Sequence, residues 1–420
     1  MSATLTPLPA GTARHFAWTR AAHVARVIAA LETAAPGAAR FVGGCVRDSL
    51  LGETPKDIDV ATTLTPDAVI EALKVAHLGA APTGIDHGTV TAIADHKGVE
   101  VTTLRADVST DGRRATVAFT RDWASDARRR DFTINALYLT PALDLFDPGE
   151  GMKDLAARRV RFIGAPEDRI REDYLRILRF FRFSARFADT FDGQGLAACA
   201  ALKSGIQRLS AERIGDEMTK LLRLPAPTAS VAAMQGAGVL GEIWASAPDI
   251  ETLARLKAIA PDAPAPLALA ALFGEAGGGI DNRLRLSNAD GRRRRHALAN
   301  AAHLSPALDE RAARALLYDM GAASWRDACL LAEARALAVD ETPGVRDRRI
   351  QSLSTLPERW PPPTLPFAGK DALAAGVPQG PLVAAVIKAA ERRWIAEDFP
   401  ARERAMAIFQ EEAARVTSTG

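Results

Sequence analysis

The chain has 420 residues, of which 48% are hydrophobic and 25% charged, and its formal net charge is +2. This composition is typical of a soluble globular protein with two to four packed units, and it excludes wholesale disorder and a polycationic chain. The most apolar run, residues 267–273, is well under half the length of a transmembrane helix, and the N-terminus lacks the pattern of a secretory signal. Cys45, Cys199 and Cys329 form no CxxC pair, which favours a reducing cytoplasm and no structural zinc.

Two kinds of pattern divide the chain. Up to about residue 147, short β-branched segments alternate with Gly, Asp and Pro, which predicts a small α+β unit. After about residue 154, amphipathic and Ala-rich helices are predicted to continue to the end. The predicted strands are 40–42, 56–61, 90–94 and 99–104, and the helices predicted among them are 23–33, 46–51 and 66–74. The helical part has breaks rich in Pro or Gly at 224–227, 277–279 and 360–363.

The first predicted strand runs into Gly43 and Gly44, and a predicted helix follows at once. Glycines let a ligand approach the backbone closely, and the N-terminus of a helix favours anions. Arg47 lies one turn into this helix and is suited to holding a phosphate through two hydrogen bonds. An ordinary tight turn explains paired glycines equally well, so this segment alone does not identify a phosphate site.

Two predicted strands carry acidic residues. Asp57 and Asp59 are two apart in the strand 56–61, and residues two apart on a strand point to the same face. Neighbouring carboxylates repel each other unless a cation lies between them, and oxygen ligands favour Mg²⁺. Glu100, on the strand 99–104, would complete a cluster of three carboxylates. Solvent-exposed acids at a sheet edge are the alternative explanation.

In combination, the glycine turn, the arginine and the three carboxylates suit nucleotidyl transfer by two metal ions. The motifs Gly43-Gly44-x-Val46-Arg47-Asp48 and Asp57-x-Asp59 resemble those of the polymerase β-like nucleotidyltransferase superfamily. More narrowly, the chain resembles the class II tRNA nucleotidyltransferases, which are CCA-adding enzymes, and the closely related bacterial poly(A) polymerases. Three further segments carry this resemblance in the family's order: 107–119, 129–137 and Glu172-Asp173-x-x-Arg176.

The resemblance implies an α+β fold, in which a polymerase β-like nucleotidyltransferase head, a small mixed sheet with helices, is followed by an all-α neck, body and tail. We therefore expect a catalytic head at 22–152, a nucleotide-selecting neck at 153–224, a body at 225–356 and a tRNA-binding tail at 357–420. The blocks that carry the resemblance cover roughly residues 40–220. The assignment of the body and the tail therefore has less support from sequence motifs than that of the head and the neck.

The resemblance also assigns roles to single residues. Asp57, Asp59 and Glu100 would be catalytic and would bind two Mg²⁺ ions. The residues expected to bind the incoming nucleotide are Gly44, Arg47, Arg130, Asp173, Arg176, Arg179 and Arg182. The residues expected in a flexible loop are Asp111, Gly112 and Arg113.

Base selection would depend on Asp173 and Arg176, which are three apart on a helix predicted at 171–187 and hence neighbours on its surface. A carboxylate accepts from an amino group and a guanidinium donates to a ring nitrogen or carbonyl, so this pair suits cytosine and, after a small rotation, adenine. In the resembled family such a pair selects the nucleotide, and Glu172 would fix the orientation of the arginine. A surface ion pair on one helix is the alternative.

The activity that the resemblance implies is the addition of C, C and A to the tRNA 3′ end from CTP and ATP, with release of pyrophosphate. The expected partner is tRNA, held at its acceptor end and elbow; no protein partner is readable, no membrane is expected, and the expected location is cytoplasmic. A poly(A) polymerase is the main alternative, but Leu104-Arg105-Ala106-Asp107 lacks the basic block of many such enzymes. A non-catalytic RNA-binding protein and a small-molecule nucleotidyltransferase are further alternatives. No His-Asp dipeptide occurs, so no added phosphohydrolase activity is expected.

Overall fold

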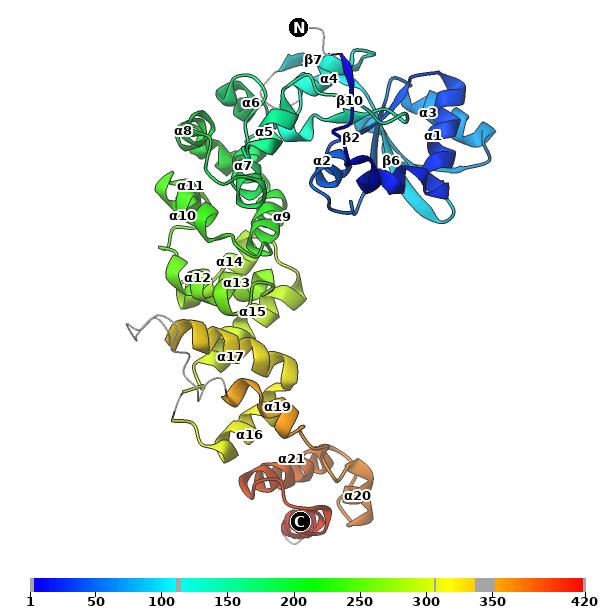
Figure 1. Cartoon of the computed structure of the whole chain (residues 1–420). Coiled ribbons are helices and arrows are strands. Elements are labelled where there is room, and N and C mark those ends of the chain that lie inside the picture. The colour runs from blue at the N-terminus through cyan, green and yellow to red at the C-terminus, as the bar shows by residue number, and fades with distance from the viewer. Residues whose placement is uncertain (1–3, 111–114, 306, 337–351, 418–420) are drawn as a thin grey trace. The chain divides into compact units, whose positions relative to one another are not determined.

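The computed structural model describes residues 4–110, 115–305, 307–336 and 352–417. The chain divides into two compact units, the first comprising Met1–Leu221 and Ala229–Ala245 and the second Leu222–Thr228 and Ser246–Gly420. The predicted head and nearly all of the predicted neck belong to the first unit, which carries every strand of the described residues (Figure 1). The four predicted domain boundaries stay predictions.

A mixed sheet of eight strands forms the centre of the first unit. In spatial order its strands are β1 (Leu5–Pro7), β10 (Asp144–Phe146), β9 (Tyr138–Leu139), β2 (Ala39–Val42), β3 (Asp59–Thr62), β6 (Lys97–Thr103), β5 (Thr89–Ala94) and β4 (Gly79–Gly84). β3 and β6 are parallel, and the other neighbouring pairs of this sheet are antiparallel. β7 (Arg105–Thr110) and β8 (Ala115–Phe119) form a separate ribbon. The predicted α+β head is confirmed, although four of the eight strands of its main sheet and both strands of the ribbon were not predicted.

Two helices, α1 (Ala22–Ala34) and α3 (Pro66–Val75), pack against each other and against β5 and β6 (Figure 1). Val24 and Leu31 of α1 are fully buried and seven residues apart, which places both on one apolar helix face. The Thr65 side chain accepts a hydrogen bond from a backbone N–H of α3 and so fixes where that helix begins. These helices support β6, the strand on which Glu100 lies.

The strand predicted at 56–61 begins later, at Asp59. Its neighbour β2 ends at Val42, because Gly43 has a φ of 75° and turns the chain away from the sheet. No residue of β2 therefore remains to pair with Asp57, which lies in the bend before β3. The prediction that Asp57 lies on this strand is therefore wrong, although Asp57 and Asp59 still line one cleft, as described below.

The helix predicted at 171–187 is two helices, α6 (Pro166–Glu172) and α7 (Leu175–Phe187). Asp173 between them is extended, with φ −154° and ψ 104°, and its Oδ1 accepts the first backbone N–H of α7 at 3.1 Å. A carboxylate that caps the next helix in this way competes with a continuous helix. The prediction that Asp173 and Arg176 are neighbours on one helix surface is wrong, because a hinge separates α6 from α7.

The rest of the first unit is mainly helical. Its further elements are α2 (Gly44–Leu50), α4 (Trp123–Arg128), α5 (Gly151–Ala156), α8 (Gly193–Ala201), α9 (Ala211–Leu222), α10 (Thr228–Gly236) and α11 (Val239–Ile243), with the 3-10 segments η1 (Ala13–Arg20), η2 (Ile85–His87), η3 (Thr133–Asn135) and η4 (Lys203–Arg208). Phe180 of α7 is fully buried and stacks on Phe162, with ring centroids 5.4 Å apart. The face of α7 that carries Phe180 therefore packs into the core.

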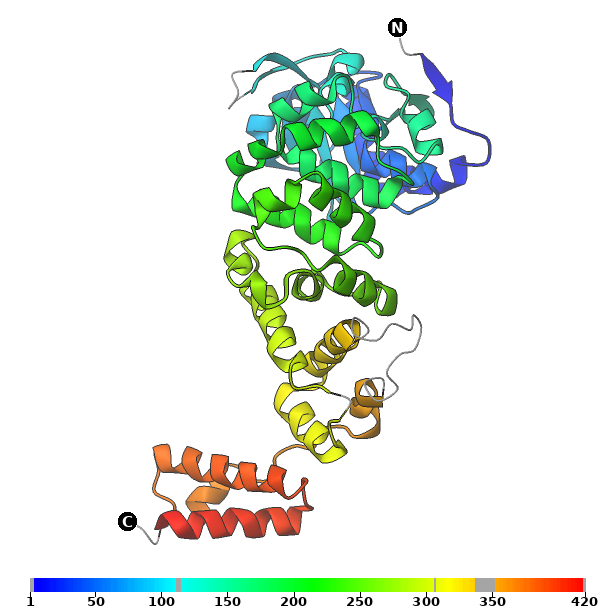
Figure 2. The same ribbon diagram turned by 90° about the vertical axis from the view of Figure 1, so that its left-hand side faces the viewer.

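The second unit is helical throughout its described residues. Its elements are α12 (Ile250–Ile259), α13 (Ala265–Phe273), η5 (Gly274–Gly277), α14 (Ile280–Arg283), α15 (Asn288–Ala301), α16 (Glu310–Met320), α17 (Ala322–Ala336), α19 (Leu356–Arg359), α20 (Gly369–Ala374), α21 (Pro381–Ala396) and α22 (Arg402–Thr417). Every residue of α13 is buried, which explains its uninterrupted apolar sequence. In the tail, α21 and α22 lie side by side around Trp394 and Phe409 (Figure 2). None of the helices described here has the length and apolar character required to cross a membrane.

Candidate active site

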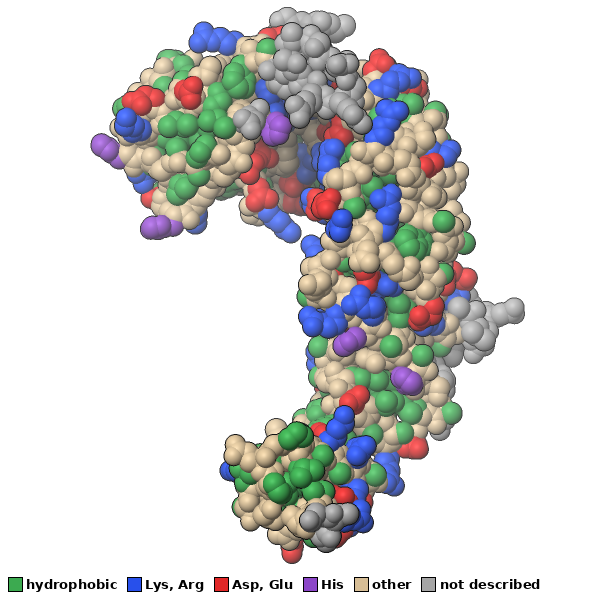
Figure 3. All heavy atoms as spheres, turned by 180° about the vertical axis from the view of Figure 1, so that it is seen from behind, with side chains coloured by type: hydrophobic (Ala, Val, Ile, Leu, Met, Phe, Trp, Pro, Cys, Tyr) green, Lys and Arg blue, Asp and Glu red, His purple; other side chains and the backbone are tan. Residues whose placement is uncertain are grey.

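A cleft of about 840 Å³ in the first unit gathers most of the predicted site residues. Figure 3 shows this hollow with acidic and basic side chains facing it. The predicted residues that line it are Gly44, Arg47, Asp57, Asp59, Glu100, Arg130, Asp173, Arg176, Arg179 and Arg182. Glu172 is outside this lining but forms an ion pair with Arg176. The predicted loop residues Asp111, Gly112 and Arg113 lie outside the described residues.

The glycine turn forms one wall of the cleft. Gly43 has φ 75° and ψ −125°, a conformation that L side chains rarely adopt, and α2 begins at Gly44. Arg47 of α2 is buried, donates from Nη1 to Asn135 Oδ1, and donates from Nε to Asp48 Oδ1 at 2.8 Å. Burial lowers the pKa of Arg47, and the charge of Asp48 opposes that shift. The guanidinium is thereby held in one orientation at the edge of the cleft.

The acidic residues form a second wall. Asp59 and Glu100 lie directly opposite each other on the parallel strands β3 and β6. Burial, and next the charge of Glu100, raises the pKa of Asp59 from 3.8 to about 6; Arg130 opposes this, and Asp57 adds to it. Among the described residues, no three Asp, Glu, His or Cys side chains converge closely enough to hold a metal ion. The three carboxylates therefore share one cleft without forming a closed ligand set.

The crowding of negative charge at Asp59 fits a cation site. Carboxylate oxygens are the ligands that Mg²⁺ prefers, and a bound cation would favour the ionised form of Asp59. Asp57, Asp59 and Glu100 all line the cleft, so each presents an oxygen donor to the same space. These residues match the donor chemistry of a magnesium site.

The raised pKa of Asp59 predicts a pH-dependent stability in protein freed of divalent metal by a chelator. A carboxyl whose pKa is higher in the folded state binds more protons when folded, so stability falls as the pH rises from about 4 to about 6. Asp59→Asn is expected to increase the free energy of unfolding by up to about 3 kcal/mol near neutral pH and to have little effect near pH 4. Urea unfolding across this range measures it, with the exposed Asp67→Asn as control; a difference that is constant with pH would contradict it.

Arg130 is held in place by two residues that the sequence analysis missed. Its Nη2 donates to Asp126 Oδ2 at 3.1 Å and its Nε to the Tyr138 hydroxyl at 3.0 Å, and that hydroxyl donates to the same Asp126 oxygen at 2.7 Å. Burial acts to raise the pKa of Asp126, but the charge of Arg130 and the hydrogen bonds outweigh it and lower that pKa. Asp126 therefore stays ionised and fixes Arg130 beside the carboxylates.

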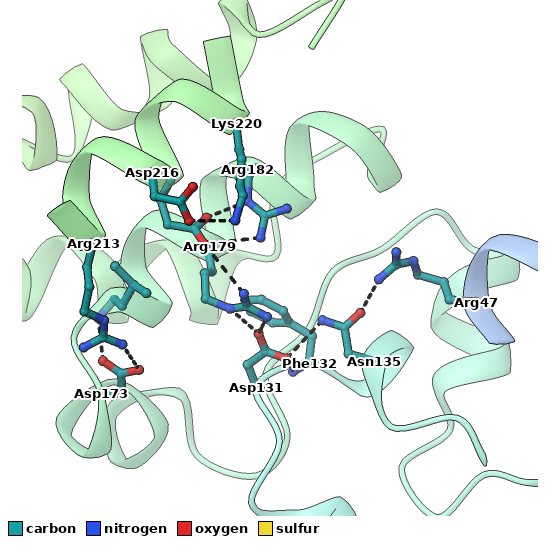
Figure 4. Close-up of polar contacts among 12 residues, drawn as sticks. Arg47, Asp131, Phe132, Asn135, Asp173, Arg179, Arg182, Arg213, Asp216 and Lys220 are labelled. Atoms are coloured by element: carbon teal, nitrogen blue, oxygen red, sulfur yellow. Dashed lines mark hydrogen bonds and ion pairs between the residues drawn. The ribbon is translucent and has the colours of Figure 1, made fainter. Parts of the chain in front are cut away.

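A second network connects the neck arginines to buried acids (Figure 4). Arg179 Nε donates to Asp131 Oδ2 at 2.7 Å, and Arg182 Nε donates to Glu217 Oε2 at 2.5 Å. Arg179 Nη1 also lies 3.6 Å from Glu217 Oε1, so the acid joins the two arginines. Asn135 Nδ2 donates to Asp131 Oδ1 at 3.0 Å, which extends the network toward Arg47.

The sequence analysis missed Asp131 and Glu217 as partners of these arginines. Asp131 lies in the block 129–137, directly after two arginines, and that position was the available signal. Its ion pair with Arg179 spans 48 residues, so spacing along the chain does not reveal it.

The two residues predicted to read the base have separate supports. Arg176 Nη1 donates to Glu172 Oε2 at 2.7 Å and its Nη2 donates to the backbone carbonyl of Arg129 at 2.8 Å. Asp173 Oδ2 instead accepts from Arg213 Nη2 of α9 at 2.7 Å (Figure 4). Both side chains line the cleft. Asp173 and Arg176 are therefore brought together as predicted, but by the hinge between α6 and α7 and not by one face of a single helix.

Comparison with known proteins shows what the two halves of this site are similar to. Residues 39–161 match the model of the poly(A) polymerase head domain, and residues 190–252 match the model of a probable RNA- and SrmB-binding site of polymerase A. The human mitochondrial CCA tRNA nucleotidyltransferase 1 is 47% identical over 187 residues, which cover 44% of this chain and 43% of that protein. The CCA-adding enzyme of Oceanobacillus iheyensis is 44% identical over 185 residues, covering 44% of this chain and 45% of that enzyme. The match spans less than half the length of these curated relatives.

The head and neck are therefore similar to the corresponding parts of CCA tRNA nucleotidyltransferases and to the poly(A) polymerase head domain. A crystal structure of the Bacillus stearothermophilus CCA-adding enzyme in complex with CTP is similar along nearly the whole chain, with a TM-score of 0.73 and 26% identity over 94% of this chain and 98% of that one. The Thermotoga maritima CCA-adding enzyme, with a TM-score of 0.65 and 19% identity over 96% of this chain and 98% of that one, shares the fold. The structural likeness to the Bacillus stearothermophilus enzyme therefore extends beyond the first unit into the second.

Proposed function

We propose that this chain is a CCA-adding tRNA nucleotidyltransferase, which attaches C, C and A in turn to a tRNA 3′ end from CTP and ATP and releases pyrophosphate. The observation that carries the proposal is the cleft in which Asp57, Asp59 and Glu100 of the head share one space with Asp173 and Arg176 of the neck. The sequence identity to CCA-adding enzymes in the head and neck supports it.

In the proposed reaction, the RNA 3′ hydroxyl attacks the α-phosphorus of the nucleotide and displaces pyrophosphate. Asp57, Asp59 and Glu100 would hold Mg²⁺, which when bound lowers the pKa of the attacking hydroxyl and stabilises the leaving pyrophosphate. Arg130 lines the cleft near Asp59 and would bind a phosphate oxygen. Gly44 would let the triphosphate approach the backbone closely.

Arg179 and Arg182 of the neck would bind the triphosphate together with the residues of the head that line the same cleft. Arg179 and Arg182 are both paired with buried or partly buried acids, so their guanidinium groups are already oriented before a nucleotide arrives. Groups that are oriented in advance lose less entropy on binding, which strengthens the interaction. Arg47, fixed by Asn135 and Asp48, would act in the same way on the head side.

Base selection would depend on the hydrogen bonds that Asp173 and Arg176 can still form with a base. Asp173 Oδ2 accepts from Arg213, and a carboxylate oxygen can accept a second hydrogen bond, here from an exocyclic amino group of cytosine or adenine. Arg176, oriented by Glu172, would donate to a ring nitrogen or carbonyl. Uracil and guanine lack this order of donors and acceptors, so each would leave a polar group unpaired.

The proposed macromolecular substrate is tRNA, with its acceptor end in the cleft and its elbow on the body and tail. The proposed location is the cytoplasm, which the three buried free thiols Cys45, Cys199 and Cys329 support. The proposed nucleotide substrates are CTP and ATP, and the proposed cofactor is Mg²⁺.

A tRNA transcript that lacks its last three nucleotides tests the function. With Mg²⁺, we expect growth by two nucleotides with CTP alone and by three with CTP and ATP, read on a gel of single-nucleotide resolution. Failure to add the final A to a tRNA that ends in CC would contradict the proposal. A transcript that already ends in CCA is the control and should not grow.

The second candidate is a poly(A) polymerase, because the head matches a family model named for that activity. It predicts a long ladder from ATP alone on RNA without tRNA structure. The same gel separates the two candidates, because a CCA-adding enzyme stops after one A.

A further inference from the structure

Two residues, Asp173 and Tyr174, form the whole connection between α6 and α7. The Asp173 carbonyl accepts from the Arg176 backbone N–H at 3.0 Å, and the Tyr174 carbonyl accepts from the Ile177 backbone N–H at 3.1 Å. Tyr174 thus lies between the two residues that the proposed function assigns to base selection. A change in the position of Tyr174 is expected to move both of them.

The ring of Tyr174 rests on the backbone of η4 at Gly205. A Cβ added at Gly205, which is buried, would lie 1.8 Å from Cδ1 and 2.0 Å from Cε1 of Tyr174. Non-bonded carbon atoms do not approach so closely, so any larger residue at 205 must displace the ring. The guanidinium carbon of Arg208 is 5.4 Å from the ring centroid. Residues three apart eclipse each other in a 3-10 helix, so Gly205 and Arg208 present one face of η4 to the ring.

Two other glycines of the first unit serve as comparisons for Gly205. A Cβ at Gly195 would also meet an aromatic ring, but less closely, at 2.8 Å from Cε2 of Phe180, which belongs to the core and does not line the cleft. A Cβ at Gly236 would meet nothing within 4 Å. Gly195 therefore provides a buried glycine whose substitution meets a core ring instead of Tyr174.

We propose that Gly205 and Tyr174 are positioning residues for base selection, because the ring against bare backbone fixes the orientation of Asp173 and Arg176. The inference rests on the proposed function and adds to it the residues that set the accuracy of the Asp173–Arg176 pair. Hydrogen-bonded recognition needs its groups held within about 0.5 Å of the productive geometry, which a displaced hinge does not provide. Loss of the contact should therefore reduce the preference for CTP over UTP more than it reduces incorporation itself.

Gly205→Ala in the full chain tests the inference. On a tRNA transcript lacking its last three nucleotides, the ratio of kcat/KM for CTP to that for UTP is expected to fall about tenfold. Tyr174→Phe keeps the ring and should leave the ratio unchanged. Tyr174→Ala removes the ring, and the double variant Gly205→Ala/Tyr174→Ala should match Tyr174→Ala alone, because the added methyl then meets no ring.

Gly195→Ala is the matched control and should lower Tm without changing the CTP to UTP ratio. If Gly205→Ala behaves in the same way, the contact is purely structural and the inference is wrong. If Gly205→Ala does not fold, equal ratios in Tyr174→Ala and Tyr174→Phe would overturn the inference, and a lower ratio in Tyr174→Ala alone would support it. Wild-type protein that incorporates neither C nor A would instead refute the proposed function, and this inference with it.

Discussion

Asp59→Asn is expected to lower the rate of CTP incorporation by at least about a thousandfold. The substitution keeps the shape of the side chain but removes one of the negative charges that line the cleft with Asp57 and Glu100. An amide is a much weaker ligand for Mg²⁺ than a carboxylate, so the charge on the attacking oxygen and the leaving pyrophosphate would no longer be balanced. Single-turnover incorporation of one CMP measures the chemical step separately from tRNA binding.

The same variant should be at least as stable as the wild type near neutral pH, because burial and the charge of Glu100 raise the pKa of Asp59 to about 6. A loss of activity therefore cannot be attributed to unfolding. Asp67→Asn, on the exposed side of α3, is the control and should keep full activity. Unchanged incorporation by Asp59→Asn would refute the assignment of Asp59 as a catalytic residue.

Asp131→Ala is expected to lower the free energy of unfolding by about 3 kcal/mol, because it removes the closest partner of the partly buried Arg179 and the acceptor of the Phe132 backbone N–H. Asp131 is 8% exposed; its Oδ2 accepts from Arg179 Nε at 2.7 Å, and its Oδ1 accepts from the Phe132 backbone N–H at 2.8 Å. Without the carboxylate, Arg179 keeps the longer contact with Glu217 at 3.6 Å and its place over the Phe183 ring. Urea unfolding at neutral pH measures the loss.

The pH dependence of this loss has a definite sign. Burial acts to raise the pKa of Asp131, but the charge of Arg179 and the hydrogen bonds outweigh it and lower that pKa. A lowered carboxyl pKa contributes stability that is present above about pH 4 and is lost as the pH falls further, so the variant and wild type should converge in acid. Asp216→Ala, which removes only a surface ion pair with Lys220, should cost less than about 1 kcal/mol. Equal losses from both substitutions would contradict the buried network.

Local sequence patterns predicted the α+β head, the glycine turn and the acidic residues of the cleft, because glycine turns and acidic pairs are local signals. The arginines of the cleft and the roles of its residues were predicted from the family resemblance. The order of the sheet was not predictable in this way, since β1 pairs with β10 although most of the head lies between them in the sequence. The hinge at Asp173 was missed because the Asp173 side chain accepts a hydrogen bond from the first backbone N–H of α7, which competes with an otherwise good helical pattern.

The spacing of residues along the chain also could not predict which acids pair with the arginines. Glu217 joins Arg179 and Arg182 from α9, and Arg213 of the same helix holds Asp173. Their identity as charged residues was visible in the sequence, but their pairing depends on how α9 packs against α7. Side chains that support a site from another helix are therefore the part of the site that sequence reasoning leaves open.

The parallel pairing of β3 and β6 has a consequence for the order of folding. α3, β4 and β5 lie between these strands in the chain, so Asp59 and Glu100 face each other only after that whole segment has closed. Contacts between distant parts of a chain form slowly because the intervening loop must first be ordered. During synthesis, the acidic centre would remain unassembled until β6 has been made and paired with β3, and a head folded without this pairing would lack the facing acids on which nucleotide transfer depends.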